Sequence, residues 1–127
     1  MTIKSNLFYT KDHEWLEFEG DTVTLGISAH AQEQLGDIVF VELPDEEREV
    51  KMGDQLGVVE STKAVSDFYS SVDGKVIEVN NTVADSPETI NSDPYGDGWL
   101  VKIKFTNKSS ELMDSNAYEA YLKEETK

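Results

Sequence analysis

The stretch GVVESTKAVSDFY, residues 57–69, holds a single lysine between two runs of β-forming residues. If the two runs pair as an antiparallel hairpin, Lys63 stands at the tip and points into water. The segment STKA between the runs lacks an Asn-Gly or Gly-Gly pair, so it does not indicate a tight two-residue turn. An ordinary solvated turn lysine is the alternative interpretation, since most lysines in proteins are exposed.

Short runs of β-forming residues continue on both sides of this stretch. One run alternates cleanly and places Val23, Leu25 and Ile27 on one face. The pair Asp73-Gly74 predicts a hairpin turn, because both residues tolerate positive φ. Many short strands with turns every eight to twelve residues or so predict a small sandwich or barrel. The expected strands are 15–19, 22–27, 38–43, 56–60, 65–72, 75–79 and 99–105.

Two helices are expected among these strands. Ser28 is a suitable N-cap for a short helix over residues 29–35, which Gly36 would close. Ser115 is a suitable N-cap for a C-terminal helix, in which apolar residues recur at helical spacing. Residues 84–98 are rich in proline and glycine and predict a loop that includes a short helical turn.

The composition is that of a soluble globular protein with an acidic surface. The chain has 127 residues, of which 11 are Lys or Arg and 26 are Asp or Glu, giving a formal net charge of -15. Such a surface repels phosphate and anionic lipid, which argues against nucleic acids and membranes as partners. No apolar run approaches the roughly 20 residues of a membrane span, and the first residues show no signal or transit peptide pattern. Without a visible linker, we expect one domain over residues 1–127.

Sulfur and metal chemistry have few candidate side chains in this sequence. The chain has no cysteine, which removes disulfides, thiol nucleophiles and cysteine-based metal sites. Any sulfur redox chemistry therefore needs sulfur from outside the chain. His13 and His30 lack a spacing that suggests a metal pair, so the sequence predicts no metal site. We expect His30 to cap its short helix or to pack within it.

Five longer motifs stand in order along the chain: YTKDHEW at 9–15, GISAHAQEQLGDIVFVELP at 26–44, GVVESTKAVSD at 57–67, INSDPYGDGWL at 90–100 and YEAYL at 118–122. In this order they resemble the glycine cleavage system H-protein family nearly from end to end. Departures from the family pattern are the highly charged turn at 45–49, Ser71 in place of a common proline and Thr62 in place of a common valine. The resemblance implies a mainly β, lipoyl-domain-like barrel-sandwich hybrid with a short internal helix and a C-terminal helix.

The resemblance also implies a non-catalytic carrier of covalently bound lipoic acid. In that family the lysine matching Lys63 holds the lipoyl group in amide linkage. The group takes an aminomethyl unit from the pyridoxal-phosphate glycine decarboxylase (P protein) to the tetrahydrofolate-dependent aminomethyltransferase (T protein), and dihydrolipoamide dehydrogenase (L protein) reoxidises it. We expect a monomer in the bacterial cytoplasm rather than a mature mitochondrial protein.

A lipoate ligase or a lipoyl/octanoyl transferase is a further implied partner, because an exposed lysine with a pKa near 10.4 does not acylate itself at pH 7. Lipoyl proteins generally have a Glu three residues before the lysine and a Gly eleven residues after it. Glu60 and Gly74 match these positions and are expected to assist recognition. A solvated strand residue and a plain turn glycine are the alternative interpretations.

Glu14 and Asp67 are the candidates for contact with the loaded arm. The amine of an aminomethylated arm is cationic near neutral pH, and a carboxylate in a groove would hold it and shield it from water. Glu14 lies in the first family motif, and Asp67 lies four residues after the lysine. With 26 acidic residues in the chain, an ordinary surface acid is an equally good interpretation of either.

Three other functions are weighed against the carrier of glycine cleavage. Biotin carriers share the general architecture but place methionines beside the modified lysine, whereas Thr62 and Ala64 stand here. A lipoyl donor or relay in cofactor assembly is compatible with the sequence, and reconstitution with the decarboxylase would separate it. An enzyme in its own right is the weakest alternative, and turnover without partners would favour it.

Overall fold

The fold consists of two antiparallel sheets connected by short helices. A computed structural model describes residues 3–125. One sheet has six strands in the order β1-β2-β3-β9-β8-β5, and the other has three in the order β4-β6-β7. The strands are β1 Phe8–Tyr9, β2 Glu14–Glu19, β3 Thr22–Ile27, β4 Ile38–Glu42, β5 Glu49–Val50, β6 Gln55–Ser61, β7 Val65–Tyr69, β8 Val72–Val79 and β9 Val101–Lys108. The helices are α1 Ala29–Leu35, α2 Asn81–Asp85, α3 Thr89–Ser92 and α4 Ser115–Glu125.

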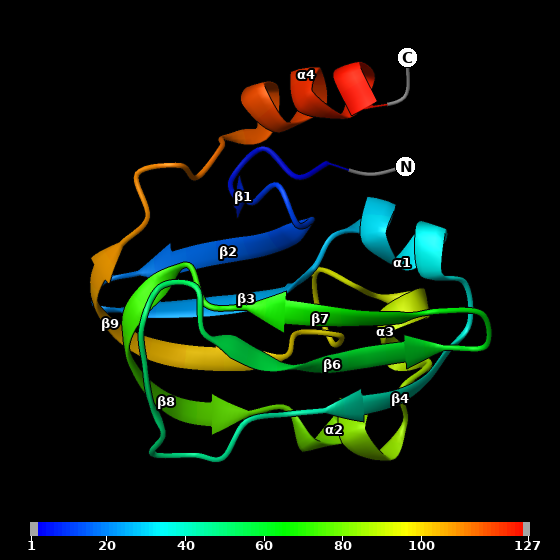
Figure 1. Cartoon of the computed structure of the whole chain (residues 1–127), viewed down its shortest axis with the longest axis horizontal. Coiled ribbons are helices and arrows are strands. Elements are labelled where there is room, and N and C mark those ends of the chain that lie inside the picture. Colours follow the sequence, from blue (N-terminus) through cyan, green and yellow to red (C-terminus); the bar gives the residue numbers. More distant parts are fainter. Residues whose placement is uncertain (1–2, 126–127) are drawn as a thin grey trace.

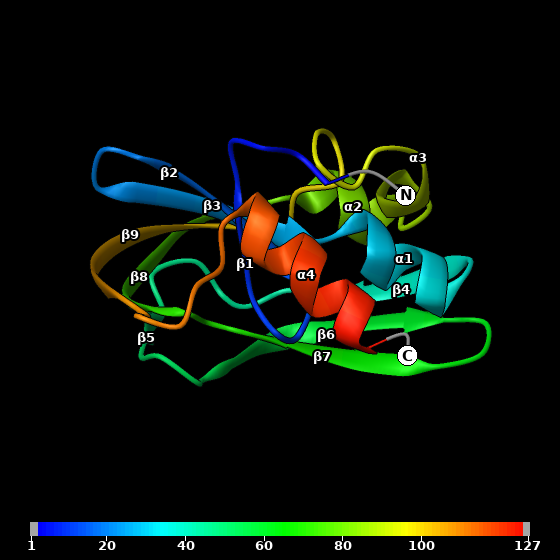
Figure 2. The same ribbon diagram turned by 90° about the horizontal axis from the view of Figure 1, so that it is seen from above.

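The sheets form two layers, with helices at the edges. The β4-β6-β7 sheet lies in front of β2, β3 and β9 in Figure 1, and the view from above in Figure 2 separates the same layers. Helix α4 lies across the top of the molecule above β1, and α1 stands at the end toward which the β6–β7 hairpin points. The expectation of a mainly β fold with a short internal helix and a C-terminal helix is confirmed.

The main apolar core joins the two layers. It includes Val23 and Leu25 of β3 together with Val59 and Phe68 of the β6–β7 hairpin, and each of these side chains is at most 1% exposed. Burial of an apolar side chain of this size stabilises the fold by about 1.5–3 kcal/mol. The base of the hairpin is therefore fixed to the body of the protein, while its tip projects beyond the core.

A second apolar cluster fixes the C-terminal helix. Tyr118 and Leu122 of α4 pack with Tyr9 and Trp15 from the first two strands. The rings of Tyr9 and Tyr118 are stacked, with centroids 4.3 Å apart and planes 1° from parallel. The apolar stripe predicted for this helix thus faces β1 and holds α4 against it.

Helix α1 has the boundaries that the sequence predicts. The side chain of Ser28 accepts a hydrogen bond from the backbone of Ala31, which satisfies one of the free N–H groups of the first turn. Gly36 ends the helix at a φ of 81°, in the region that a residue with a Cβ rarely adopts. Local capping residues alone therefore locate this helix.

The hairpin predicted at Asp73-Gly74 was wrong, because β8 runs through this pair from Val72 to Val79. The chain instead reverses just before β8, and the side chain of Ser70 there bonds the backbone of Val72 in both directions. The register with β9 shifts between Asp73 and Gly74. A Cβ at Gly74 would overlap the carbonyl oxygen of Lys104, so glycine allows two strands to approach closely at a bulge rather than a turn.

Two other local predictions can be compared with the structure. The C-terminal helix is capped by Asp114, whose carboxylate accepts a hydrogen bond from the backbone of Ala117 at 2.8 Å, and not by Ser115. The short helical turn expected within 84–98 is present as α3, which lies wholly inside that segment together with the end of α2. Within residues 3–125, no helix has both the length and the apolar character needed to cross a bilayer.

Candidate functional site

The β6–β7 hairpin carries Lys63 at its tip, as the sequence predicts. Glu60 faces Val65 in the last pair of the antiparallel ladder. Beyond this pair the chain turns without the Asn-Gly signal of a two-residue loop. The backbone N–H of Ser61 donates to the carbonyl of Ala64 at 2.8 Å, which closes the turn.

Ser61 provides the side chain that replaces the missing turn glycine. Its hydroxyl accepts hydrogen bonds from the backbone of Lys63 at 3.3 Å and of Ala64 at 3.0 Å. The backbone N–H of Thr62 also donates to the carbonyl of Asp37 at 3.1 Å, which ties the tip to the segment between α1 and β4. A turn with these bonds is rigid, although no residue in it is specialised for positive φ.

The side chain of Lys63 projects from this turn into solvent. It is exposed, and its stem runs alongside Gly36, where a Cβ would lie 3.6 Å from the Lys63 Cε. Among residues 3–125, no carboxylate forms an ion pair with its amine. The amine is therefore available to an enzyme that must reach it from outside.

The two residues expected to assist recognition lie in different places. Glu60 is half-buried beside the tip, in the middle strand of the small sheet between Phe40 and Val65. Gly74 lies in the other sheet, where it pairs with Val50 of β5. The structure thus brings Glu60 next to Lys63 but gives Gly74 a packing role away from the tip.

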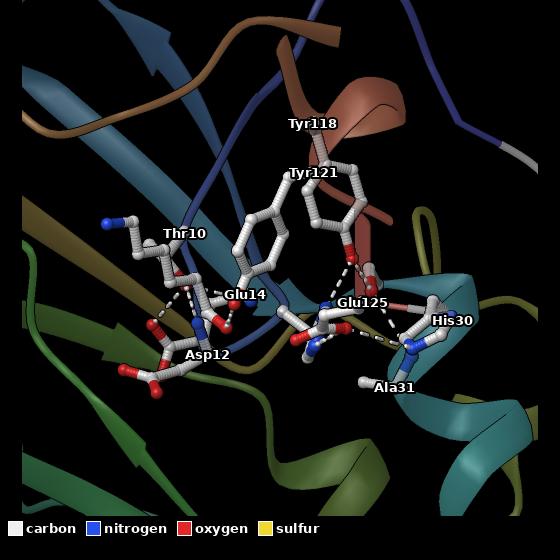
Figure 3. Close-up of polar contacts among 11 residues, drawn as sticks. Thr10, Asp12, Glu14, His30, Ala31, Tyr118, Tyr121 and Glu125 are labelled. Atoms are coloured by element: carbon white, nitrogen blue, oxygen red, sulfur yellow. Dashed lines mark hydrogen bonds and ion pairs between the residues drawn. The ribbon is translucent and has the colours of Figure 1, made fainter. Parts of the chain in front are cut away.

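Glu14 is a buried carboxylate in β2. It is 2% exposed, and its two oxygens accept hydrogen bonds from the Thr10 hydroxyl at 2.9 Å and the Tyr69 backbone at 2.7 Å. Thr10 and Glu14 lie side by side in Figure 3. Burial raises the pKa of the Glu14 carboxyl to about 7, although both hydrogen bonds favour the charged form. A cation beside Glu14 would therefore lower this pKa and keep the carboxylate charged near neutral pH.

Asp67 lies on the outer face of the hairpin, where it is exposed. Its carboxylate accepts hydrogen bonds from the side chain of Gln55 at 3.2 Å and the hydroxyl of Tyr69 at 3.4 Å. Because the backbone of Tyr69 also bonds Glu14, one tyrosine connects the two acids that the sequence singles out.

An open groove of about 600 Å³ begins at this tyrosine. Three acids line it, Asp12, Glu14 and Glu111, so it suits a cationic guest better than an anionic one. Its other lining residues are Met52, Gly53, Tyr69, Ser70, Ser71 and Ser109. The groove opens one strand length from the tip, roughly 17 Å along β7 at about 3.3 Å per residue. An arm attached at the tip must lie back along the hairpin to reach it.

Sequence reasoning missed several residues that build these features. Thr10 and Tyr69 hold Glu14 in place, and Ser61 shapes the turn. Ser61 carries a local signal, since a serine two residues before an exposed turn position can bond the backbone. His13 and His30 also lie against each other, with ring centroids 4.5 Å apart, and no local signal announces that contact.

The chain is similar over nearly its whole length to known proteins. Residues 7–125 match the family model described as glycine cleavage H-protein. The glycine cleavage system H protein of Herpetosiphon aurantiacus is 48% identical over 123 residues, which cover 97% of this chain and 95% of that protein. The protein of the same name from Symbiobacterium thermophilum is 50% identical over 124 residues, which cover 96% and 97%.

A solved structure agrees with this similarity. The crystal structure of a glycine cleavage system H protein from Mycobacterium marinum matches with a TM-score of 0.90 at 41% identity, over 95% of this chain and 99% of that chain. The likeness covers both sheets and the helices between them. The lipoyl-domain-like architecture expected from the sequence is thereby confirmed.

Proposed function

We propose that Lys63 is the lipoyl-attachment residue of this chain, which belongs to the glycine cleavage system H-protein family. As a member of that family, the protein is a non-catalytic carrier whose cofactor is lipoyllysine. When bound, the lipoyl dithiolane supplies the sulfur that receives and releases the aminomethyl group of glycine. The chain's own contribution is to present, orient and shelter that group.

The position of Lys63 is the observation that carries this assignment. An acylating enzyme needs a lysine that enters its active site without unfolding the substrate protein. Lys63 is exposed at a turn that Ser61 holds by three hydrogen bonds. A rigid tip reduces the ordering entropy lost when the enzyme binds it. The absence of cysteine from the chain fits a carrier whose working sulfur belongs to the cofactor.

We further propose that Glu60 contributes to recognition by the lipoylating enzyme, a lipoate ligase or a lipoyl/octanoyl transferase. Its place beside the turn supports this role, because a protein that surrounds Lys63 would also meet the end of β6. Gly74 is proposed as an indirect contributor. Its close packing against β9 shapes the sheet rather than the tip, so its effect on recognition would act through the fold.

Glu14 and Asp67 are proposed to contact the arm when it is loaded. The acidic groove supports this role, since a cationic amine that enters it meets Glu14 on one wall. Each carboxylate oxygen of Glu14 has already accepted one hydrogen bond and retains a second lone pair for a guest. Asp67, bonded to the same Tyr69, lies on the path between tip and groove.

The enzymes that exchange groups with the arm are proposed as partners in turn. The family places the protein in the glycine cleavage system. On that basis we propose that it docks to the glycine decarboxylase, the aminomethyltransferase and dihydrolipoamide dehydrogenase. We also propose that it does so as a monomer in the bacterial cytoplasm, because the relatives compared above are bacterial. Size-exclusion chromatography of the purified chain tests the monomer.

Intact-mass measurement tests the attachment residue. The purified chain is incubated with lipoate, ATP and a lipoate ligase. We expect the wild type to gain one lipoyl group, and Lys63→Arg to gain none. Lys51→Arg changes another exposed turn lysine and should be modified like the wild type. Full modification of Lys63→Arg would exclude Lys63 as the site.

Exchange of labelled carbon dioxide into glycine, catalysed by the decarboxylase, then tests the carrier role. The lipoylated wild type should support it and Lys63→Arg should not. In Glu14→Gln, hydrolysis of the aminomethylated arm, measured as ammonia release, should be about tenfold faster than in the wild type. This is the effect expected from the loss of one charge-assisted contact. Glu19→Gln, at the exposed end of the same strand, is the matched control. Lipoylated protein that is inert with the decarboxylase yet donates lipoyl groups would favour the relay.

A further inference from the structure

Three side chains of metal-ligating type meet near the hydroxyl of Tyr118. His13 follows β1, His30 belongs to α1, and Glu125 is the last residue of α4. The Nε2 atom of His13 lies 3.2 Å from Oε1 of Glu125, and the Nε2 atom of His30 lies 3.9 Å from the same oxygen. In Figure 3 the Glu125 carboxylate and the His30 ring point toward each other beneath Tyr118.

The spacing of these atoms is close to that of a zinc site. A tetrahedral zinc ion with bonds of about 2.0–2.1 Å holds neighbouring ligand atoms roughly 3.3 Å apart. One ligand atom from each of the three side chains lies within 4.8 Å of the others, so shifts of about 1.5 Å or less bring them to that distance. We propose that His13, His30 and Glu125 bind a divalent metal ion of the zinc class, with water in the fourth position.

The His13 ring is already oriented for this role. Its Nδ1 atom is hydrogen-bonded to the Tyr118 hydroxyl at 2.8 Å, and that hydroxyl is bonded to the Ser28 hydroxyl at 2.8 Å. A hydrogen bond at one imidazole nitrogen fixes the ring so that the other nitrogen faces the metal, as in protein zinc sites generally. Tyr118 is itself held by its stack on Tyr9.

The backbone at His13 is held in an uncommon conformation. Its φ is 68°, a region that residues with a Cβ enter at some cost. Two backbone hydrogen bonds keep it there: His13 donates to Thr10 at 3.1 Å, and Ser28 donates to His13 at 2.8 Å. A glycine would relieve the strain but would supply no imidazole. The fold therefore holds an imidazole at a position that would suit glycine.

The electrostatic setting also favours a cation. Glu125 brings one negative charge, and the whole chain carries a formal charge of -15. The set of two imidazoles and one carboxylate is a known ligand combination for zinc. Hard cations such as magnesium prefer sites built from oxygen alone.

A bound ion would link three elements of the fold directly through its ligands. It would tie the end of α4 to α1 and to the segment before β2. Because it binds only the folded arrangement, it would stabilise that arrangement by mass action. The site involves neither Lys63 nor the acidic groove lining, so it stands or falls independently of the attachment residue.

Nuclear magnetic resonance of the unlipoylated full-length chain tests the site directly. The chain has two histidines and no cysteine, so both rings can be followed and no protein thiol competes. Zinc is titrated in a large excess of magnesium, which saturates carboxylate-only sites. We expect both histidine rings to shift together and to saturate at one zinc per chain. A shift of one ring alone, or no shift, would overturn the proposal.

Calorimetry on variants separates the three ligands from the acidic surface. Glu125→Gln and His30→Gln should each weaken zinc binding by at least tenfold, because each removes a ligand. Glu119→Gln makes the same charge change on an exposed turn of α4 and should bind within about twofold of the wild type, since exposed charges contribute little. Equal weakening by Glu119→Gln and Glu125→Gln would show that zinc binds the surface charge, and would refute the site.

Tyr118→Phe tests the orientation of His13 without removing a ligand. The substitution keeps the aromatic ring and removes the hydroxyl that bonds Nδ1. Loss of such an outer contact typically weakens metal binding by roughly 10- to 100-fold. Zinc should also raise the melting temperature of the wild type more than that of Glu125→Gln. Unchanged zinc affinity in Tyr118→Phe would show that His13 is not oriented by this contact.

Discussion

The tip of the β6–β7 hairpin and the cluster of His13, His30 and Glu125 are both small polar sites at the same end of one fold. At the tip, Ser61 fixes the turn through bonds to residues two and three positions further along the chain. In the histidine cluster, the three side chains meet only because α4 folds back over β1. The first site is therefore a property of one segment, and the second is a property of the packed molecule. Perturbations should separate them.

The largest effect is expected from moving the lysine along the tip by one residue. The exchange Thr62→Lys with Lys63→Thr keeps the composition of the turn. It displaces the amine by more than an ångström, a misplacement that costs about 10²-fold in rate. We expect the rate of lipoylation, followed by intact mass, to fall by at least that factor. Zinc binding at the histidine cluster should stay unchanged, and a lipoylation rate near that of the wild type would contradict a locally specified site.

The complementary perturbation is Leu122→Ala in α4. Leu122 is 5% exposed and packs in the second apolar cluster. Its truncation should lower the free energy of unfolding by about 2–4 kcal/mol, measured with urea. Since α4 carries Glu125, the zinc affinity should fall together with the stability, whereas the lipoylation rate should stay unchanged. Lys123→Ala, on the exposed side of the same helix, is the control. If Leu122→Ala lowered the lipoylation rate as much as the zinc affinity, the distinction between the two sites would be contradicted.

A pH effect is expected from the tyrosine stack beneath α4. Burial raises the pKa of the Tyr9 and Tyr118 phenols above their ordinary value near 10. Between the unfolded and folded pKa values the folded state holds more protons, so stability is full below pH 10 and falls as the pH rises above it. Tyr9→Phe removes one of these groups. Its melting temperature should therefore decline less between pH 9 and pH 11 or so than that of the wild type.

Absorbance of tyrosinate near 295 nm measures the same linkage directly. The pKa values of all five tyrosines are raised, so the native protein should titrate later than free tyrosine. Tyr69→Phe is a useful comparison, because the Tyr69 side chain lies at the hairpin and not in the stack. An equal gain in alkaline stability from both variants would place the effect outside the stack.

A smaller effect is expected from Ser61→Ala. The substitution removes the acceptor for the backbone of Lys63 and Ala64, which costs about 1 kcal/mol. If this loss falls on the conformation that the lipoylating enzyme recognises, the rate of lipoylation drops about fivefold. Ser66→Ala lies on the exposed face of the same hairpin and should leave the rate unchanged. An unchanged rate in Ser61→Ala would mean that the enzyme itself orders the tip.

The same division between segment and packed molecule decides what could be predicted from the sequence. Helix α1 was predicted with its boundaries, because Ser28 and Gly36 act on their immediate neighbours. The hairpin was predicted because its two strands are adjacent in the chain. Asp73-Gly74 misled the prediction, since the same dipeptide serves a turn or a bulge and only the partner strand decides. The sequence therefore predicts features that depend on neighbouring residues, but not features that depend on which strand or helix packs against them.

The side chains of the two candidate sites depend even more on tertiary packing. The sequence motifs selected Glu14, but its burial and its bond to Tyr69 depend on β7 lying against β2. The sequence spacing of His13 and His30 predicts no metal site, but a spacing rule of this kind applies only to ligands from one segment. The end of α4 brings the third ligand from the other terminus. No spacing rule could include Glu125.

The smallest effect should come from salt, and it should distinguish the two regions once more. With a formal charge of -15, the protein is guided toward partner surfaces of opposite sign over distances near the screening length, about 8 Å at physiological ionic strength. Raising sodium chloride from 50 to 500 mM or so should weaken docking to the glycine decarboxylase by a few-fold, measured by surface plasmon resonance mainly as a slower association. Zinc binding at the histidine cluster should change less, because its affinity comes from directed ligand bonds rather than from the surface field. A docking affinity that is flat across this range would mean that shape and apolar contact at the hairpin, and not charge, bring the partners together.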